Sequence, residues 1–304
     1  MEVEEPSVYS NKTRTVSFDQ FEACLLCGSA LLTSLSGYEQ HYLVQCTVCG
    51  FIFCKRKPTM DELNTHYALY PRARGISDIT LKRYNELLDK FEPYRKTNNL
   101  LDVGCGDGFF LIEARKRNWK VFGTEFTRKA IDVCLQKGIQ MTNSPLNPQH
   151  YHPESFDVIT SFEVIEHINT PQTEFQSFYS LLRKGGALYI TTPNFNSLSR
   201  IILKSKWNVI EYPEHLSYYT VQTLCALGRK YRFKRVTAKT TGISINRFRA
   251  IISNPQNSEM GDSDEEIRQK ADKRIIFRLL KSMINAVLNV TRKGDAMKVL
   301  FNRL

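Results

Sequence analysis

The segment 100–110 reads LLDVGCGDGFF and decides the fold. Its apolar start is typical of a buried strand, and it ends in an acid and three glycines spaced two apart: Asp102, Gly104, Gly106 and Gly108. Glycine permits positive φ values and a close approach to the backbone, and a following helix N-terminus adds unpaired N–H donors. The segment therefore predicts a parallel strand that turns sharply into a helix, with a ligand resting on the turn.

The glycine spacing G-x-G-x-G separates two classes of ligand. The dinucleotide fingerprint requires its third glycine three residues after the second, and Phe109 occupies that position. Nicotinamide binding is therefore disfavoured. The turn instead resembles motif I, D-x-G-x-G-x-G, of the class I S-adenosylmethionine (SAM) methyltransferases. A doubly wound domain that binds another nucleotide-like ligand is the alternative.

Three later segments match the same family in order. A second strand is predicted in WKVFGTEFT (119–127), and it ends at Glu125, 23 residues after Asp102. An acid at this place can accept both ribose hydroxyls of an adenosine. SFDVITSFEVIEHI (155–168) resembles the fourth strand and GGALYITTPN (185–194) the fifth. The resemblance covers residues 96–304. It implies an α/β, Rossmann-like fold with a doubly wound, mostly parallel seven-stranded sheet in the strand order 3-2-1-4-5-7-6.

The resemblance also implies which residues bind SAM. They lie on the turn and at the ends of the strands: Asp102, Gly104, Cys105, Gly106, Gly108, Glu125, Phe126, Ser144, Ser161, Phe162 and Glu163. One segment departs from the family pattern. Many relatives carry an acid after the third strand that accepts from the adenine amino group, but residues 141–149 hold no carboxylate. Asn143, Ser144 or backbone groups would have to serve there.

Four cysteines near the N-terminus form a second motif, C-x2-C-x18-C-x2-C: Cys24, Cys27, Cys46 and Cys49. Each C-x2-C knuckle directs two thiolates at one point, and two knuckles complete a closed tetrahedral zinc site. Gly28 and Gly50 follow the knuckles, where the chain must turn tightly. A four-thiolate site has no open position for water or substrate, so we expect a structural zinc ion.

The motifs predict the domain organisation. Residues 1–20 form a flexible tail, 21–57 a zinc ribbon, 58–95 a connector with a helix, and 96–304 the methyltransferase domain. Within that domain, 195–235 is the acceptor-pocket segment and 262–293 an inserted basic amphipathic helix. No apolar run reaches the roughly 18 residues of a membrane span. The acidic N-terminus is unlike a signal peptide, and the cysteine usage suits a reducing compartment, so we expect a cytoplasmic protein.

The net charge of +11 is concentrated in the last quarter of the chain. Residues 229–304 hold 18 Lys and Arg against 7 Asp and Glu, which leaves 24 of each sign in residues 1–228. Much of the basic excess falls on the predicted helix. A basic amphipathic helix can lie on an anionic membrane, so residues 264–290 are a candidate for peripheral membrane contact. A solvated basic face is the preferred interpretation.

The chemistry requires few residues, because SAM is already an activated methyl donor. The protein must hold donor and acceptor in line and take a proton from the acceptor where needed. Open α/β sheets bind ligands at the carboxyl ends of their strands, where two clusters lie, EVIEH (163–167) and EYPEHLSYY (211–219). We predict catalytic roles for His215, Glu214 and His167, with base and pocket-wall roles of equal weight for His215. The predicted substrate-binding residues are Tyr67, Tyr70, Asn194 and Tyr218.

The two clusters resemble different relatives. PEHL with a following aromatic residue, together with the ribbon, is similar to C-methyltransferases of nucleotide-linked deoxysugars, where the Glu-His pair at 214 and 215 supplies the base. E-x-x-E-H at 163–167 is similar to isoprenoid quinone O-methyltransferases, some of which hold magnesium there. Buttressing of the cofactor loop is preferred over magnesium binding. We therefore predict a SAM-dependent methyltransferase of a small or carrier-linked acceptor, a sugar in first place and quinone-type O-methylation as an alternative.

Two further functions are disfavoured. Some ribosomal RNA base methyltransferases also join a zinc ribbon to this fold, and an rRNA or tRNA substrate would suit a basic chain. However, the ribbon shows no Lys/Arg stripe with interleaved aromatics, and SFEVIEH lacks the Asn/Asp-Pro-Pro-aromatic clamp of exocyclic amine methylation. A non-enzymatic scaffold has no need of an intact cofactor turn. The oligomeric state is left open by the sequence.

Overall fold

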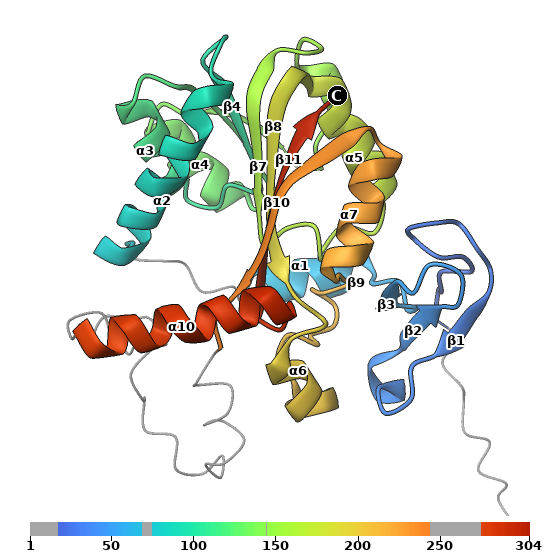
Figure 1. The fold of residues 1–304 in the computed structure, drawn as a ribbon. Coiled ribbons are helices and arrows are strands. Elements are labelled where there is room, and N and C mark those ends of the chain that lie inside the picture. Colours follow the sequence, from blue (N-terminus) through green and yellow to red (C-terminus); the bar gives the residue numbers. More distant parts are fainter. Residues whose placement is uncertain (1–17, 69–74, 144, 244–274) are drawn as a thin grey trace, which may run out of the picture.

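A computed structural model describes residues 18–68, 75–143, 145–243 and 275–304, which form two sheets with helices around them (Figure 1). Most of the predicted tail, Tyr70, Ser144 and the first part of the predicted basic helix lie outside the described residues. The remaining predicted site residues fall within them.

The larger sheet has seven strands in the order β10-β11-β8-β7-β4-β5-β6. The strands are β4 (Asn99–Val103), β5 (Lys120–Glu125), β6 (Gln140–Asn143), β7 (Phe156–Phe162), β8 (Leu182–Pro193), β10 (Phe233–Thr241) and β11 (Ala296–Arg303). β11 pairs antiparallel with both β8 and β10, and the remaining pairs of the sheet are parallel. Counted along the methyltransferase domain, this order is 3-2-1-4-5-7-6, and the predicted fold is confirmed.

Helices cover both faces of this sheet (Figure 1). One face carries α2 (Asp78–Phe91), α3 (Phe109–Lys116) and α4 (Arg128–Gln136), and the other carries α5 (Pro171–Leu181) and α7 (Val221–Lys230). Polar caps fix where two of them begin: Ser77 Oγ accepts from Thr80 N at the start of α2, and Thr220 with Thr223 forms a capping box at α7. Each helical layer buries its own apolar cluster against the sheet.

The smaller sheet joins the ribbon to the acceptor-pocket segment. Its order is β1 (Leu32–Ser34), β2 (Leu43–Cys46), β3 (Ile52–Cys54) and β9 (Ser217–Tyr218). The last strand comes from the methyltransferase part, with Ile52 opposite Tyr218 in the pairing. The rings of Phe51 and Tyr219 lie 5.1 Å apart beneath this sheet. The ribbon and the acceptor-pocket segment therefore share a sheet and a core.

Three helices lie at the carboxyl end of the parallel strands: α1 (Met60–Ala68), α6 (Leu198–Leu203) and α10 (Ile275–Thr291) (Figure 1). The start of α6 is bonded to the chain just after α10, since Leu198 N donates to Lys293 O at 2.8 Å and Asn194 Nδ2 donates to Gly294 O at 2.8 Å. Within the described residues, no helix is both long and apolar enough to cross a membrane.

Candidate active site

The turn after β4 is built from three glycines with positive φ. Gly104, Gly106 and Gly108 have φ of 72°, 54° and 73°. A Cβ at Gly104 would lie 2.4 Å from Val164 Cγ2, whereas a Cβ at Gly106 would meet nothing within 4 Å. Gly104 is therefore required by packing. Gly106 borders open space, where a ligand can approach the backbone.

Glu125 ends β5 beside this turn, as predicted from its spacing. Its Oε2 accepts from Gly106 N at 2.9 Å, and its Oε1 accepts from Phe126 N at 2.8 Å. These backbone donors hold the carboxylate in place at the turn. Oε1 also accepts from Thr127 N at 3.2 Å and from Thr127 Oγ1 at 3.5 Å. Each carboxylate oxygen has about two acceptor positions, so the capacity left for a ligand hydroxyl lies at Oε2, where Gly106 N is the one donor among the described residues.

Asp102 lies under the turn rather than on its surface. It is 2% exposed, and its Oδ1 accepts from Thr160 Oγ1 at 2.7 Å. Burial raises the pKa of Asp102 to about 8. The carboxyl group therefore holds its proton near neutral pH, and it connects β4 to β7 below the place where the ligand is expected.

The end of β7 contributes the next predicted residues. Ser161 is 1% exposed, and its Oγ has no hydrogen-bond partner within the described part of the chain. Phe162 packs inward, with its ring 5.1 Å from that of Phe110. Glu163 has a φ of 53° while its N donates to Thr191 O at 3.0 Å. A non-glycine residue in this region costs about 1–3 kcal/mol of strain, so the turn after β7 is held in place by its surroundings.

These features fit a polar nucleoside such as SAM. The open backbone at Gly106, the fixed carboxylate of Glu125 and the unsatisfied hydroxyl of Ser161 provide the donors and acceptors that such a ligand needs. The half-buried Cys105 lies against Met141, with 3.9 Å between their sulfur atoms, and lines the same turn.

The E-x-x-E-H cluster lies directly after β7. Glu166 is 2% exposed and accepts from Thr192 Oγ1 at 2.9 Å, and burial raises its pKa well above the usual value. His167 has its Nδ1 3.1 Å from Glu214 O and its Nε2 3.1 Å from Glu163 O. Burial, with His215 nearby, lowers the pKa of His167 to about 4. The rings of His167 and His215 are in contact, with 4.9 Å between their centroids.

The second cluster meets the first from the loop before β9. Its Glu214 is 6% exposed. Glu214 Oε2 lies 3.1 Å from Nε2 of His66 on α1, and Glu214 Oε1 lies 3.8 Å from His167 Nδ1. The ring of His215 turns toward Val209, with 2.5 Å between Nδ1 and the carbonyl oxygen. The structure thus pairs Glu214 with a histidine that the sequence did not single out.

The predicted substrate residues differ in their surroundings. Tyr67 on α1 lies 5.2 Å, ring to ring, from the half-exposed Phe126. Tyr218 is buried and donates to His215 O at 3.1 Å. Asn194 is fully buried and its amide bonds the chain after α10. Tyr67 therefore lies beside Phe126, one of the predicted cofactor residues, while Asn194 ties the chain before α6 to the chain after α10.

The four ribbon cysteines converge as their spacing predicts. The Sγ atoms of Cys24 and Cys49 are 3.5 Å apart, those of Cys27 and Cys46 are 3.6 Å apart, and all four lie within 4.8 Å of one another. A tetrahedral zinc ion with Zn–S bonds of about 2.3 Å needs sulfurs about 3.8 Å apart. Burial raises the pKa of Cys24, whereas backbone and thiol hydrogen bonds lower that of Cys46. The cluster therefore fits zinc.

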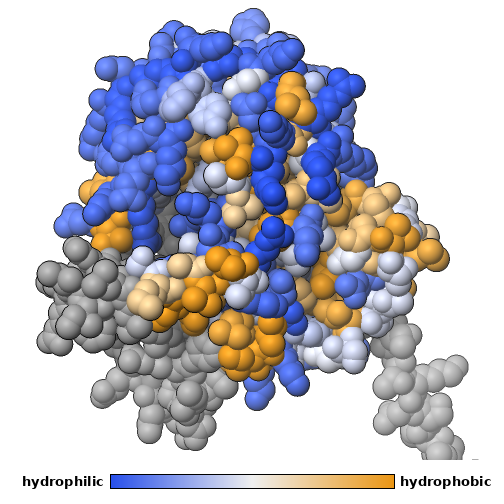
Figure 2. All heavy atoms as spheres, viewed as in Figure 1, coloured by the Kyte–Doolittle hydropathy of each residue, from blue (hydrophilic) through white to orange (hydrophobic). Residues whose placement is uncertain are grey.

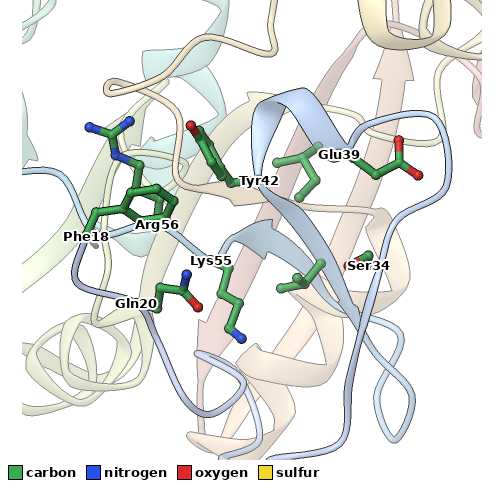
Figure 3. Close-up of a pocket in the computed structure, with 9 residues that line it drawn as sticks. Phe18, Gln20, Ser34, Glu39, Tyr42, Lys55 and Arg56 are labelled. Atoms are coloured by element: carbon green, nitrogen blue, oxygen red, sulfur yellow. The ribbon is translucent and has the colours of Figure 1, made fainter. Parts of the chain in front are cut away.

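A shallow hollow of about 260 Å³ lies on the ribbon (Figure 3). Its lining residues all come from residues 18–56 and include Phe18, Tyr42 and Arg56. Arg56 lies over the rings of Phe18 and Tyr42, at 4.9 and 5.5 Å. None of the residues at the cofactor turn lines it, so it is separate from the candidate active site.

Comparison with known proteins agrees with this geometry. A family model described as "Methyltransferase domain" matches residues 76–238, more than half of the chain. The chain is 25% identical over 142 residues to the ubiquinone biosynthesis O-methyltransferase of Aeromonas salmonicida, covering 42% of this chain and 60% of the relative. It is 32% identical over 113 residues to the mitochondrial ubiquinone biosynthesis O-methyltransferase of Rattus norvegicus, covering 34% of this chain and 33% of the relative. The matches thus span less than two thirds of these relatives.

Solved structures show the same fold at lower identity. A SAM-dependent methyltransferase from Archaeoglobus fulgidus aligns with a TM-score of 0.52 at 17% identity, over 76% of this chain and 96% of that one. The PH0226 protein from Pyrococcus horikoshii aligns with a TM-score of 0.50 at 13% identity, over 79% of this chain and 99% of that one. The chain therefore belongs to the methyltransferase-domain family, and its fold is that of the class I SAM-dependent methyltransferases.

Proposed function

We propose that this chain transfers the methyl group of SAM to a hydroxyl oxygen of a small acceptor with an apolar tail, as in quinone-type O-methylation. The names of its relatives, ubiquinone biosynthesis O-methyltransferases from a bacterium and a mammal, support an oxygen acceptor and this class of compound over the sugar that the sequence favoured. Because these matches cover 42% and 34% of this chain, the acceptor class needs support from the structure.

The roles of the residues follow from their places. The open space beside the Gly106 backbone and the carboxylate of Glu125 would hold the nucleoside, and Ser161 would supply a further hydroxyl. SAM provides a methyl group on a sulfonium, which leaves as a neutral thioether. The cluster of His66, His167, Glu214 and His215 would face the acceptor, whose hydroxyl must lose its proton as it gains the methyl group.

The observation that carries the acceptor class is an apolar surface at the same end of the sheet as the cofactor turn. We call it the α6–α10 face, and it consists of Leu198, Ile201, Ile202, Met283, Ile284, Val287 and Val290. These side chains are 37–82% exposed and make up seven of the fourteen exposed large hydrophobic residues in the described part of the chain. Figure 2 shows apolar residues over α10 and α6. Surfaces of this kind mark interaction sites rather than ordinary solvent contact.

The charge around the α6–α10 face supports a lipid surface as its partner. Lys204 and Lys206 directly follow α6 and Arg292 directly follows α10, and all three are exposed. An apolar face with basic residues at its rim binds anionic membranes. An enzyme resting on this face would have the carboxyl ends of its strands toward the membrane, where acceptors with apolar tails reside. We therefore propose peripheral membrane contact, and a cytoplasmic location stays a prediction.

A sugar linked to a carrier is the second candidate. It is supported by the pairing of β9 with β3, which joins the ribbon to the acceptor-pocket segment. A ribbon built into the acceptor side suits the resemblance to sugar C-methyltransferases. Such an enzyme would abstract a proton from carbon instead of oxygen.

The test compares both acceptors with purified full-length protein. SAM and anionic vesicles are supplied with a catechol that bears a short isoprenoid tail, or with a nucleotide-linked keto sugar, and the methylated products are identified by mass spectrometry. We expect an O-methylated catechol, with kcat/KM at least ~10-fold above that for the sugar, which corresponds to about 1.4 kcal/mol. Methylation of the sugar alone would contradict the proposal.

A further inference from the structure

His66 lies outside the residues matched by the family model, yet it contacts the candidate active site. Its Nε2 is 3.1 Å from Glu214 Oε2. The side chain of Glu214 is 7% exposed and that of His66 is 21% exposed. A buried carboxylate thus lies against Nε2, a buried nitrogen of an imidazole whose side chain is partly exposed. A carboxylate beside one ring nitrogen leaves the other nitrogen as the proton acceptor, which is the arrangement of an oriented general base.

Helix α1 places His66 between the two halves of the site. The next residue, Tyr67, has its ring 5.2 Å from that of Phe126, which directly follows the ribose-side Glu125. His66 itself reaches Glu214 on the acceptor side. Consecutive residues of one helix therefore span from the cofactor to the acceptor cluster.

The other two histidines of the cluster, His167 and His215, have ring nitrogens close to backbone carbonyl oxygens. His167 has both ring nitrogens 3.1 Å from backbone carbonyl oxygens. His215 has Nδ1 2.5 Å from Val209 O. The nearest carboxylate oxygen of Glu214 lies 3.8 Å from His167, compared with 3.1 Å from His66. Of the three, His66 makes the closest pairing with a carboxylate.

We propose that His66, oriented by Glu214, takes the proton from the acceptor hydroxyl during methyl transfer. The acceptor O–H bond breaks and its proton goes to the imidazole, while the oxygen forms a bond to the methyl carbon. The bond between that carbon and the sulfonium breaks, and its electron pair stays on sulfur. The imidazolium then returns its proton to solvent. This inference rests on the proposed O-methylation.

The groups facing His66 suit this step. Within the described residues they are Glu214 and Glu211 from the loop before β9, whose carboxylate oxygens lie within 4.8 Å of it, and the ring of Tyr67, 5.6 Å away. Two carboxylates stabilise the positive charge that the imidazole gains in the step.

The experiment compares His66→Gln and His66→Ala with Asn64→Ala, an exposed position on the same helix. The readouts are kcat across pH with the tailed catechol, and S-adenosylhomocysteine affinity by calorimetry. We expect kcat of the His66 variants to fall by ~100-fold or more. We also expect the rise of kcat with pH that accompanies deprotonation of the base to disappear in these variants. Their S-adenosylhomocysteine affinity should stay within about twofold of wild type, since cofactor residues are untouched. Added imidazole should restore part of the His66→Ala rate, and Asn64→Ala should match wild type.

Two results would overturn the assignment. One is a His66→Gln enzyme that keeps its rate and this rise of kcat with pH, above all if His215→Ala loses both. The other is a rate that depends on an added divalent metal in wild type and loses that dependence in His66→Ala, which would make His66 a ligand. Failure of the proposed function appears separately, because wild-type protein would then methylate no hydroxyl acceptor at all.

Discussion

Replacing Gly106 by alanine isolates the cofactor turn from the rest of the fold. Gly106 has a φ of 54°, and an added Cβ would meet nothing within 4 Å. The free energy of unfolding should therefore fall only by the strain of an alanine in the left-handed region, about 1–2 kcal/mol. For a large domain, each kcal/mol lowers Tm by roughly 2–4 °C. The new methyl group would occupy the space through which SAM approaches the backbone.

The expected loss of affinity follows from that overlap. Forcing one methyl group into a packed contact costs about 1–3 kcal/mol, which corresponds to roughly 5- to 150-fold in Kd. Isothermal titration with S-adenosylhomocysteine measures the loss. Gly37→Ala is the matched control, because Gly37 has a φ of 80°, equally open surroundings and a place in the ribbon. If Gly106→Ala binds like wild type, or if both variants lose affinity equally, the account of the turn is wrong.

Three further predictions address the ribbon, the α6–α10 face and Asp102. Purified protein should contain about one zinc per chain. Cys27→Ser should lower both the zinc content and Tm, because the ribbon shares its core with the methyltransferase part. An unchanged Tm after removal of the metal would contradict this. Ile202→Glu and Val287→Glu should lower binding to anionic vesicles by ~5-fold or more in co-sedimentation, whereas Leu135→Glu, equally exposed on α4, should not. Burial raises the pKa of Asp102 from 3.8 to about 8, so the folded chain keeps a proton that the unfolded chain releases, and this group's contribution to the free energy of unfolding falls as pH rises between those values. Asp102→Asn should remove that part of the pH dependence in urea unfolding, and an unchanged slope would show that Asp102 is already ionised.

The large sheet was predictable because its motifs are local. Each strand of the cofactor half ends in residues that must turn or bind, such as Gly104 after β4 and Glu125 at the end of β5. The family order then follows, and the structure confirms it. The four-cysteine cluster was equally readable, since two short knuckles with fixed spacing can meet at one point.

What the sequence did not reveal depends on contacts between distant segments. β9 has two residues and no alternation of its own, and it exists because β3, more than 160 residues earlier, offers an edge. His66 sits within N-T-H-Y-A, and nothing in that pattern signals a partner at Glu214. The one sequence feature that pointed to this helix was the adjacent Tyr67, which was predicted to bind substrate. Long-range pairings of this kind leave no periodic trace in a sequence.

The central claim is that the open backbone at Gly106 and the carboxylate of Glu125 receive SAM. A crystal structure of the full chain grown with S-adenosylhomocysteine tests it most directly. We expect the ribose hydroxyls of the ligand to bond to the carboxylate of Glu125, and the ligand to lie against the backbone of Gly106. A crevice closed by the protein's own side chains, or a ligand bound elsewhere, would contradict it.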